Sequence, residues 1–200
     1  MAEPMMVRAS DVDDAVAVLA SAFAEDPTWT WVFPDPELRP AQHAWLWRLF
    51  VEGARRYSSV WLSADRAATA VWIPPGGTDL SAEQEAELEE WIEALPAEAR
   101  HRSRAAIELF DAAHPRDEPH YFLTLLGTHA AHRGQGIGFG LLADNLRTVD
   151  EAGLPAYLEA SNPANVVLYQ RYGFQPHGSF VLPDGPQVVT MWREPRRGHA

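Results

Sequence analysis

The chain has 200 residues, a formal net charge of −12, no cysteine and no lysine, so all 16 basic residues are arginine. This negative charge argues against nucleic acid as a partner, and the lack of cysteine excludes disulfides, thiolate nucleophiles and cysteine metal sites. With 46% hydrophobic residues, including eight Trp and eight Phe, we expect one folded domain, residues 1–200, with a substantial core.

The N-terminal part predicts a strand followed by an amphipathic helix. The strand is expected at residues 7–9. Ser10 is a good N-cap, and apolar residues then recur at spacings of four, three and four, which predicts a helix from Asp11 to about Ala24.

The next segment, residues 25–36, holds three prolines, two Trp, one Phe and three carboxylates. The prolines predict a loop without regular structure. On one interpretation the loop forms an acceptor pocket with aromatic walls and acidic groups, in which Asp26, Trp29 and Trp31 bind an amine. On the other, its aromatic side chains fill the core.

A helix, two strands and a pair of helices are expected before the centre of the chain. The sequence Ser81-x-x-Gln84 is a capping box that opens the first helix of the pair, and Pro96 ends it. We interpret the pair as an insertion over one side of the sheet. These elements are expected at residues 37–57, 60–62, 68–73 and 81–113.

A glycine-rich stretch then separates a strand from a helix. The apolar run from Tyr121 to Leu126 predicts a central strand buried on both faces, and a helical pattern covers Ile137 to Glu151. Glycines at alternate positions from 134 to 140 lie between them. Because glycine lets backbone N–H groups approach a ligand and a helix N-terminus favours negative charge, this stretch is typical of a phosphate site.

Two common phosphate-binding motifs are absent from this stretch. The spacing GxGxxG would need glycine where Phe139 or Leu141 stands, and the Walker A loop needs a lysine. The pattern that remains is Arg133-x-x-Gly136-x-Gly138. A tight glycine turn without a ligand is the alternative interpretation.

Polar and aromatic residues follow the next strand, which is expected at residues 156–160. After it come Asn165 and then Tyr169, four positions apart and hence on one side of a short helix. A hairpin is expected around the turn Pro183-Asp184-Gly185-Pro186.

The glycine loop, followed at this distance by Asn165 and Tyr169, resembles the GNAT superfamily of N-acetyltransferases. The resemblance implies an α/β fold with a mixed sheet of about six to seven strands, flanked by helices, whose splayed central strands form an acetyl-CoA cleft. It also implies that Tyr169 protonates the departing thiolate. The residues that would bind acetyl-CoA are Leu126, Gly127, Thr128, Arg133, Gly134, Gln135, Gly136, Ile137, Gly138, Phe139 and Asn165.

Within this superfamily, further segments are similar to the puromycin N-acetyltransferases. These segments are Ala22–Ala24, Val71–Trp72, Tyr121–Leu123, Leu158–Ser161, Gly173–Phe174 and the hairpin turn. One difference is Glu25-Asp26-Pro27, where those enzymes have Asp-Tyr-Pro. Since that loop should face the acceptor, this difference leaves puromycin unestablished as the substrate.

The resemblance implies transfer of acetyl from acetyl-CoA to a primary amine of a small molecule, such as an antibiotic or other natural product, by direct attack in a ternary complex. Glu159 is the first candidate for the general base and Asp26 the second, although Glu159 could equally be an ordinary strand carboxylate. His129 and His132 lack a third ligand at a convincing spacing, so no metal is expected.

Two alternatives to this function remain: acetylation of a peptide or protein amine, and a non-catalytic acyl-CoA-binding module. The first residues lack the basic and apolar regions of a signal peptide, and no apolar run approaches the 18 residues of a membrane span. We therefore expect a cytoplasmic monomer or homodimer with no membrane partner.

Overall fold

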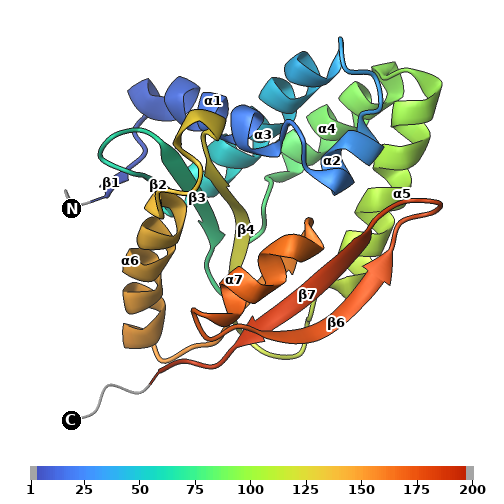
Figure 1. Cartoon of the computed structure of the whole chain (residues 1–200). Helices are drawn as coiled ribbons and strands as arrows, with labels where there is room; N and C mark the ends of the chain where they lie inside the picture. Colours follow the sequence, from blue (N-terminus) through green and yellow to red (C-terminus); the bar gives the residue numbers. More distant parts are fainter. Residues whose placement is uncertain (1–3, 197–200) are drawn as a thin grey trace.

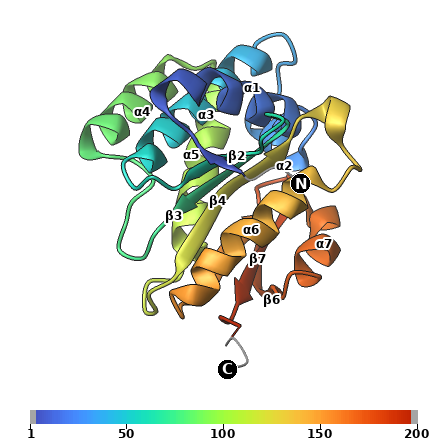
Figure 2. The ribbon, with the colours of Figure 1, turned by 90° about the vertical axis from the view of Figure 1, so that its left-hand side faces the viewer.

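The computed structural model describes residues 4–196, in which seven strands form one mixed sheet with helices on both faces (Figures 1 and 2). The strand order is β1-β2-β3-β4-β5-β7-β6, and only β4 and β5 are parallel neighbours. This confirms the expected α/β fold. The strands are β1 Met5–Met6, β2 Val60–Leu62, β3 Ala68–Ile73, β4 Tyr121–Thr128, β5 Ala156–Ala160, β6 Gln175–Val181 and β7 Gln187–Arg193.

The helices pack on the sheet through two separate apolar clusters. One face carries side chains from the first five helices, and the other carries side chains from α6 together with Phe174 and Met191. Figure 2 shows α6 running along β4 on the second face. The helices are α1 Val12–Phe23, α2 Pro27–Val32, α3 Arg39–Arg55, α4 Ala82–Ala94, α5 Ala97–Ala113, α6 Ile137–Glu151 and α7 Val166–Gln170.

Strands β4 and β5 are paired at one end only. Their register covers three pairs, from Tyr121 opposite Ala156 to Leu123 opposite Leu158. Beyond these pairs β4 continues to Thr128 and pairs with β3 alone. The two central strands therefore part in the middle of the sheet.

A β-bulge lies at the point where the strands part. Val71 pairs with Leu125 and the next residue of β3 pairs with Leu123, so Thr124 is the extra residue on β4. A bulge bends its strand and increases the local twist, and it can turn a side chain toward a site. Here the bulge directly follows Leu123, the last residue of β4 that pairs with β5.

Helix α6 lies very close to β4. A Cβ atom on Gly138 would be 2.3 Å from the Thr128 hydroxyl oxygen, so only glycine allows this approach. The helix begins at Ile137 and ends at Glu151, as its sequence pattern predicts, and Gly153 follows with a φ of +67°. A left-handed glycine at this place is a common helix ending.

Three sequence predictions in the N-terminal part are wrong in detail. The first strand lies two residues earlier than expected, although Val7 still donates its N–H to the Val60 carbonyl oxygen. Helix α1 has Asp11 rather than Ser10 at its N-cap, because a short 3-10 helix comes first. Residues 27–32, expected in a loop, form α2, since Pro27 is tolerated at the first helical position and Asp26 caps it.

The predicted helical pair α4 and α5 follows β3 and precedes β4. Both bonds of the capping box form: the Gln84 N–H donates to the Ser81 hydroxyl, and the Ser81 N–H donates to the Gln84 side chain. In Figure 1 α5 of this pair stands beside the tip of the β6–β7 hairpin. Within the described range, no helix has the length and apolar character needed to cross a membrane.

Candidate active site

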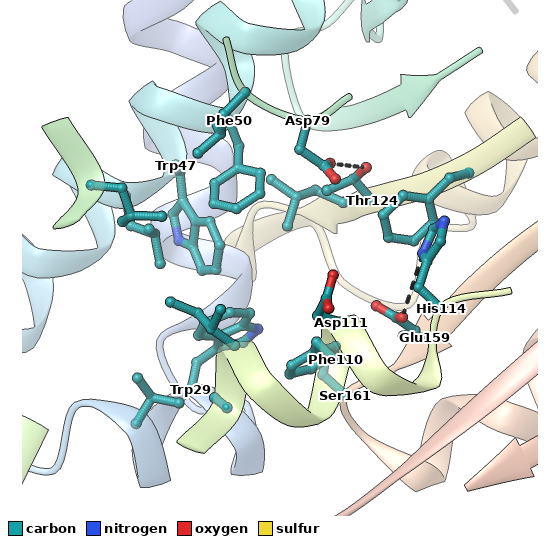
Figure 3. Close-up of a pocket in the computed structure, with 18 of the residues that line it drawn as sticks. Trp29, Trp47, Phe50, Asp79, Phe110, Asp111, His114, Thr124, Glu159 and Ser161 are labelled. Carbon is teal, nitrogen blue, oxygen red and sulfur yellow. Dashed lines mark hydrogen bonds and ion pairs between the residues drawn. The ribbon is translucent and has the colours of Figure 1, made fainter. Parts of the chain in front are cut away.

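A cavity of about 750 Å³ opens where β4 and β5 part, and helices α2 to α5 and α7 contribute to its walls (Figure 3). Five residues singled out from the sequence line it together. They lie far apart in the chain, and the parted strands and the surrounding helices bring them to one space. These residues are Trp29, Leu126, Glu159, Asn165 and Tyr169.

The glycine loop forms an open approach to the N-terminus of α6. Gly134 and Gly136 have φ values of +77° and +75°, and a Cβ on either would meet nothing within 4 Å. Arg133 donates from its guanidinium to the Ala22 carbonyl oxygen at 2.7 Å, which ties the loop to α1. The first turn of a helix carries N–H groups without helical partners, so this exposed end suits an anion.

The backbone of β4 offers hydrogen-bonding groups on the side that β5 has left. The His129 N–H donates to the Ala67 carbonyl oxygen at 2.8 Å, so His129 faces β3. Peptide groups alternate along a strand, and Leu126 and Thr128 must therefore face the opposite side. Since β5 pairs only with residues 121–123 of β4, these groups face the gap.

Glu159 on β5 is buried and its carboxyl holds a proton unusually tightly. Its side chain is 9% exposed, and Tyr157 donates its hydroxyl to Oε1 at 3.0 Å. Burial raises the pKa of Glu159 to about 8; the hydrogen bond from Tyr157 lowers this pKa and the nearby charge of Asp79 raises it. His114 Nδ1 lies 3.9 Å from Oε1. The carboxyl thus changes its charge near neutral pH.

Asp79 is a second acidic residue of the cavity, and the sequence analysis missed it. It lies in the turn between β3 and α4, where Thr124 of the bulge donates its hydroxyl to Oδ1 at 2.8 Å. Burial raises the pKa of Asp79 as well. In Figure 3 Asp79 and Glu159 approach the same space from opposite walls. A single acid in a turn has no periodic pattern, so no local signal could have found it.

Tyr169 reaches the cavity from α7, among aromatic neighbours. Its ring lies edge-on to Phe139 and Phe174, with centroids 5.8 and 6.0 Å away. Burial raises the pKa of the Tyr169 phenol, and the charge of Asp26 adds to this effect. The phenol therefore keeps its proton at neutral pH. Asn165, one turn earlier, lines the same cavity.

The three residues expected to bind substrate have different positions. Trp29 lines the cavity, whereas Asp26 and Trp31 lie outside its lining. Asp26 Oδ1 accepts bonds from the first amides of α2, and Oδ2 accepts the Ser161 hydroxyl at 2.8 Å, so it joins α2 to the end of β5. The Arg102 guanidinium lies 5.2 Å over the ring of Trp31.

The histidines near the glycine loop do not form a ligand cluster. The rings of His129 and His132 are 6.0 Å apart, and His129 Nδ1 accepts the Ala131 N–H. Between residues 4 and 196, no three histidine or carboxylate side chains are grouped so as to hold a metal ion.

Residues 97–176, which include the glycine loop, Asn165 and Tyr169, match the family model of the acetyltransferase (GNAT) domain. A solved histone acetyltransferase HPA2 and related acetyltransferase from Corynebacterium glutamicum has the same fold over 98% of both chains, with a TM-score of 0.67 and 25% identity. Residues 97–176 therefore carry a GNAT acetyltransferase domain, and the chain is an acyltransferase. GNAT enzymes in general use acetyl-CoA.

Other proteins are similar to this GNAT enzyme at lower identity or over part of their length. An uncharacterized N-acetyltransferase of Schizosaccharomyces pombe is 24% identical, over 94% of this chain and 82% of that protein. The mycothiol acetyltransferase of Nocardiopsis dassonvillei is 32% identical, but the match covers 70% of this chain and 46% of that enzyme. The Drosophila melanogaster polyamine N-acetyltransferase, with a TM-score of 0.66 at 14% identity and coverage of 96% and 99%, shares the fold.

Proposed function

We propose that this GNAT enzyme transfers the acetyl group of acetyl-CoA to a primary amine of a small molecule, by direct attack in a ternary complex. The observation that carries the proposal is that a buried acid of raised pKa, Glu159, and a protonated phenol, Tyr169, line one cavity at the parted strands. On this proposal the helical pair α4–α5 belongs to a single domain with the sheet, because its side chains complete the cavity wall.

The residues around the gap fit a CoA ester. The amides from Arg133 to Phe139 would hold the pyrophosphate, and the lack of a side chain at Gly134 and Gly136 leaves room for it. The free backbone groups of Leu126 and Thr128, with Asn165, would hold the pantetheine arm. Backbone hydrogen-bond donors near the phosphates must hold them, because the net charge of −12 disfavours a phosphate ligand. The bound ester would supply the activated acetyl group.

Glu159 is the proposed general base. An amine arrives as an ammonium ion and must lose a proton before it can attack, and a base is most effective when its pKa lies near the working pH. The pKa of about 8 at Glu159 meets this condition. Asp26, the second candidate, already accepts three hydrogen bonds as a helix cap, and we propose a positioning role for it.

Tyr169 is the proposed general acid. The ammonium first gives one proton to Glu159, and the free amine then forms the N–C bond. As the C–S bond breaks, the Tyr169 hydroxyl protonates the sulfur, and the second proton that the nitrogen loses restores the phenol. A phenol that keeps its proton at neutral pH can supply it to a thiolate whose conjugate acid has a pKa of about 8.5. No enzyme nucleophile is needed, which agrees with a chain that has neither cysteine nor lysine.

Release of the CoA thiol from acetyl-CoA tests the proposal, with puromycin, aminoglycosides, polyamines and simple alkyl and aryl amines as acceptors. We expect release with at least one amine. Tyr169→Phe should lower kcat by about 10²- to 10⁴-fold and leave the CoA Kd unchanged, because only proton transfer is lost.

Tyr172→Phe is the matched control, since Tyr172 follows on the same segment but lies outside the cavity lining. It should keep wild-type turnover. The CoA Kd can be followed by quenching of Trp fluorescence. Binding of CoA without thiol release from any of these amines would contradict the proposal and favour the non-catalytic module.

A further inference from the structure

The cavity has two chemically different ends, as Figure 3 shows. Asp79, Thr124, His114 and Glu159 lie on one side of it. Trp29, Trp47, Phe50 and Phe110 lie on the other. A ligand that fills this space would therefore meet carboxylates at one end and aromatic rings at the other.

The two carboxyl groups at the acidic end have free oxygen atoms that could bind one cation. Glu159 Oε1 and Asp79 Oδ1 accept the hydroxyls of Tyr157 and Thr124, and within residues 4–196 no other residue donates to Oε2 or Oδ2. Both carboxylates are largely removed from water, and the charge of Asp79 disfavours the ionised form of Glu159. An ammonium ion between them would relieve this repulsion and complete their hydrogen bonding.

The remaining carboxylates of the cavity wall are paired with arginine or exposed to solvent, so they would stabilise a second positive charge only weakly. Asp111 pairs with Arg116 at 2.6 Å, and Glu89 pairs with Arg104 at 3.0 Å. Glu85 is exposed to solvent on α4. The unpaired negative charge that is shielded from water is thus confined to the Asp79–Glu159 end.

The opposite end presents apolar surface that the protein itself does not cover. Trp29, Phe50 and Phe110 pack against the core cluster but stay only partly buried, and Ile107 of α5 is 42% exposed where it lines the cavity. An apolar group of a ligand would remove this surface from water, whereas a charged group would have to lose its own hydration there.

We propose that the acceptor is a primary amine with an apolar body about the size of an aromatic ring, such as an arylalkylamine. Its nitrogen lies between Asp79 and Glu159, and its body packs between Trp29, Phe50 and Phe110. This inference rests on the proposed function and narrows its substrate class. It excludes diamines and polyamines as preferred acceptors, because their second charge would lie at the apolar end.

The first test compares three acceptors with the wild-type enzyme in the thiol-release assay: 2-phenylethylamine, butylamine and 1,4-diaminobutane. One methylene in an apolar pocket changes kcat/KM by about 10- to 200-fold, so the ring should raise kcat/KM at least tenfold over butylamine. The diamine should fall below butylamine. A diamine that equals or exceeds phenylethylamine would overturn the inference and leave the proposed function standing. No release from any amine would overturn both.

A charge placed at the apolar end gives the second test. Ile107→Glu adds a carboxylate at an exposed cavity residue, so it should lower the ratio of phenylethylamine to diaminobutane kcat/KM at least tenfold. Val181→Glu is the matched control, since Val181 is 61% exposed on β6 and lies outside the cavity lining. It should leave the ratio unchanged. An unchanged ratio in Ile107→Glu would also overturn the inference.

Discussion

Replacing Glu159 by Gln should stabilise the protein while it removes the proposed base. The folded state holds the Glu159 proton up to a pKa of about 8, whereas an unfolded chain releases it near 4.5. The stability that this proton provides is fully present below pH 4.5 and is lost as the pH rises through 8. Gln resembles the neutral carboxyl and has no proton to lose, so the variant avoids this loss.

The size of the effect follows from the two pKa values. One pKa unit corresponds to about 1.4 kcal/mol, so the raised pKa of this carboxyl lowers the stability of the folded state by about 4 kcal/mol at pH 8 and by about 1 kcal/mol at pH 5, relative to its full value at low pH. For a chain of this length 1 kcal/mol moves the Tm by about 2–4 °C. We therefore expect Glu159→Gln to raise the Tm by roughly 10 °C at pH 8, and by much less at pH 5.

Urea unfolding followed by far-UV circular dichroism at both pH values measures this difference. Glu87→Gln is the matched control, because it removes the same charge from an exposed position on α4 and should change the free energy of unfolding by less than about 0.5 kcal/mol. A Glu159→Gln variant that gains no stability at pH 8, or gains equally at both pH values, would refute the reasoning. Its kcat should fall by about 10²- to 10⁴-fold.

Three further predictions concern the neighbours of the site and the frame around it. Removing the charge of Asp79 with Asp79→Asn should lower the pKa of Glu159 and move the rise of kcat/KM with pH to lower values; an unmoved pH profile would count against their coupling. Arg193→Met breaks a bidentate pair at 2.7 and 2.8 Å whose arginine is 2% exposed, and should cost about 3 kcal/mol in urea unfolding. Gly138→Ala places a methyl group 2.3 Å from a threonine hydroxyl on β4 and should lower stability by about 1–3 kcal/mol in the same assay; wild-type stability would show that α6 can shift freely.

Elements with a strong periodic pattern and clear end signals were predictable from the sequence. The bounds of α6 and β5 agree with the expected ones. In both elements glycine, proline or asparagine lies close to each end of the apolar pattern and marks where it stops. Helix α2 was missed because Pro27 breaks a helix in its interior but favours the first position, and Asp26 before it was not read as a cap. Strand β1 has two residues, too few for a pattern.

Only the part of the candidate site whose residues lie in one continuous stretch of the sequence was predictable. The glycine loop, Asn165 and Tyr169 form a linear motif, and the resemblance of this motif to the GNAT superfamily indicated a shared site. Asp79 and His114 enter the cavity because a bulge turns β4 and because α4 and α5 stand over the gap. Nothing in their local sequence indicates this proximity, since the contact joins segments about 45 residues apart in the chain, as for Asp79 and Thr124.

The parted strands also have a consequence for the lifetime of the protein in a cell. The sheet consists of two halves, β1–β4 and β5–β7, joined by three residue pairs. A ligand seated along β4 would add the hydrogen bonds that this seam lacks, and at a hundredfold excess over its Kd it would stabilise the folded state by about 2.7 kcal/mol. Degradation removes the transiently open population first, so the amount of enzyme would rise and fall with the supply of its acyl donor.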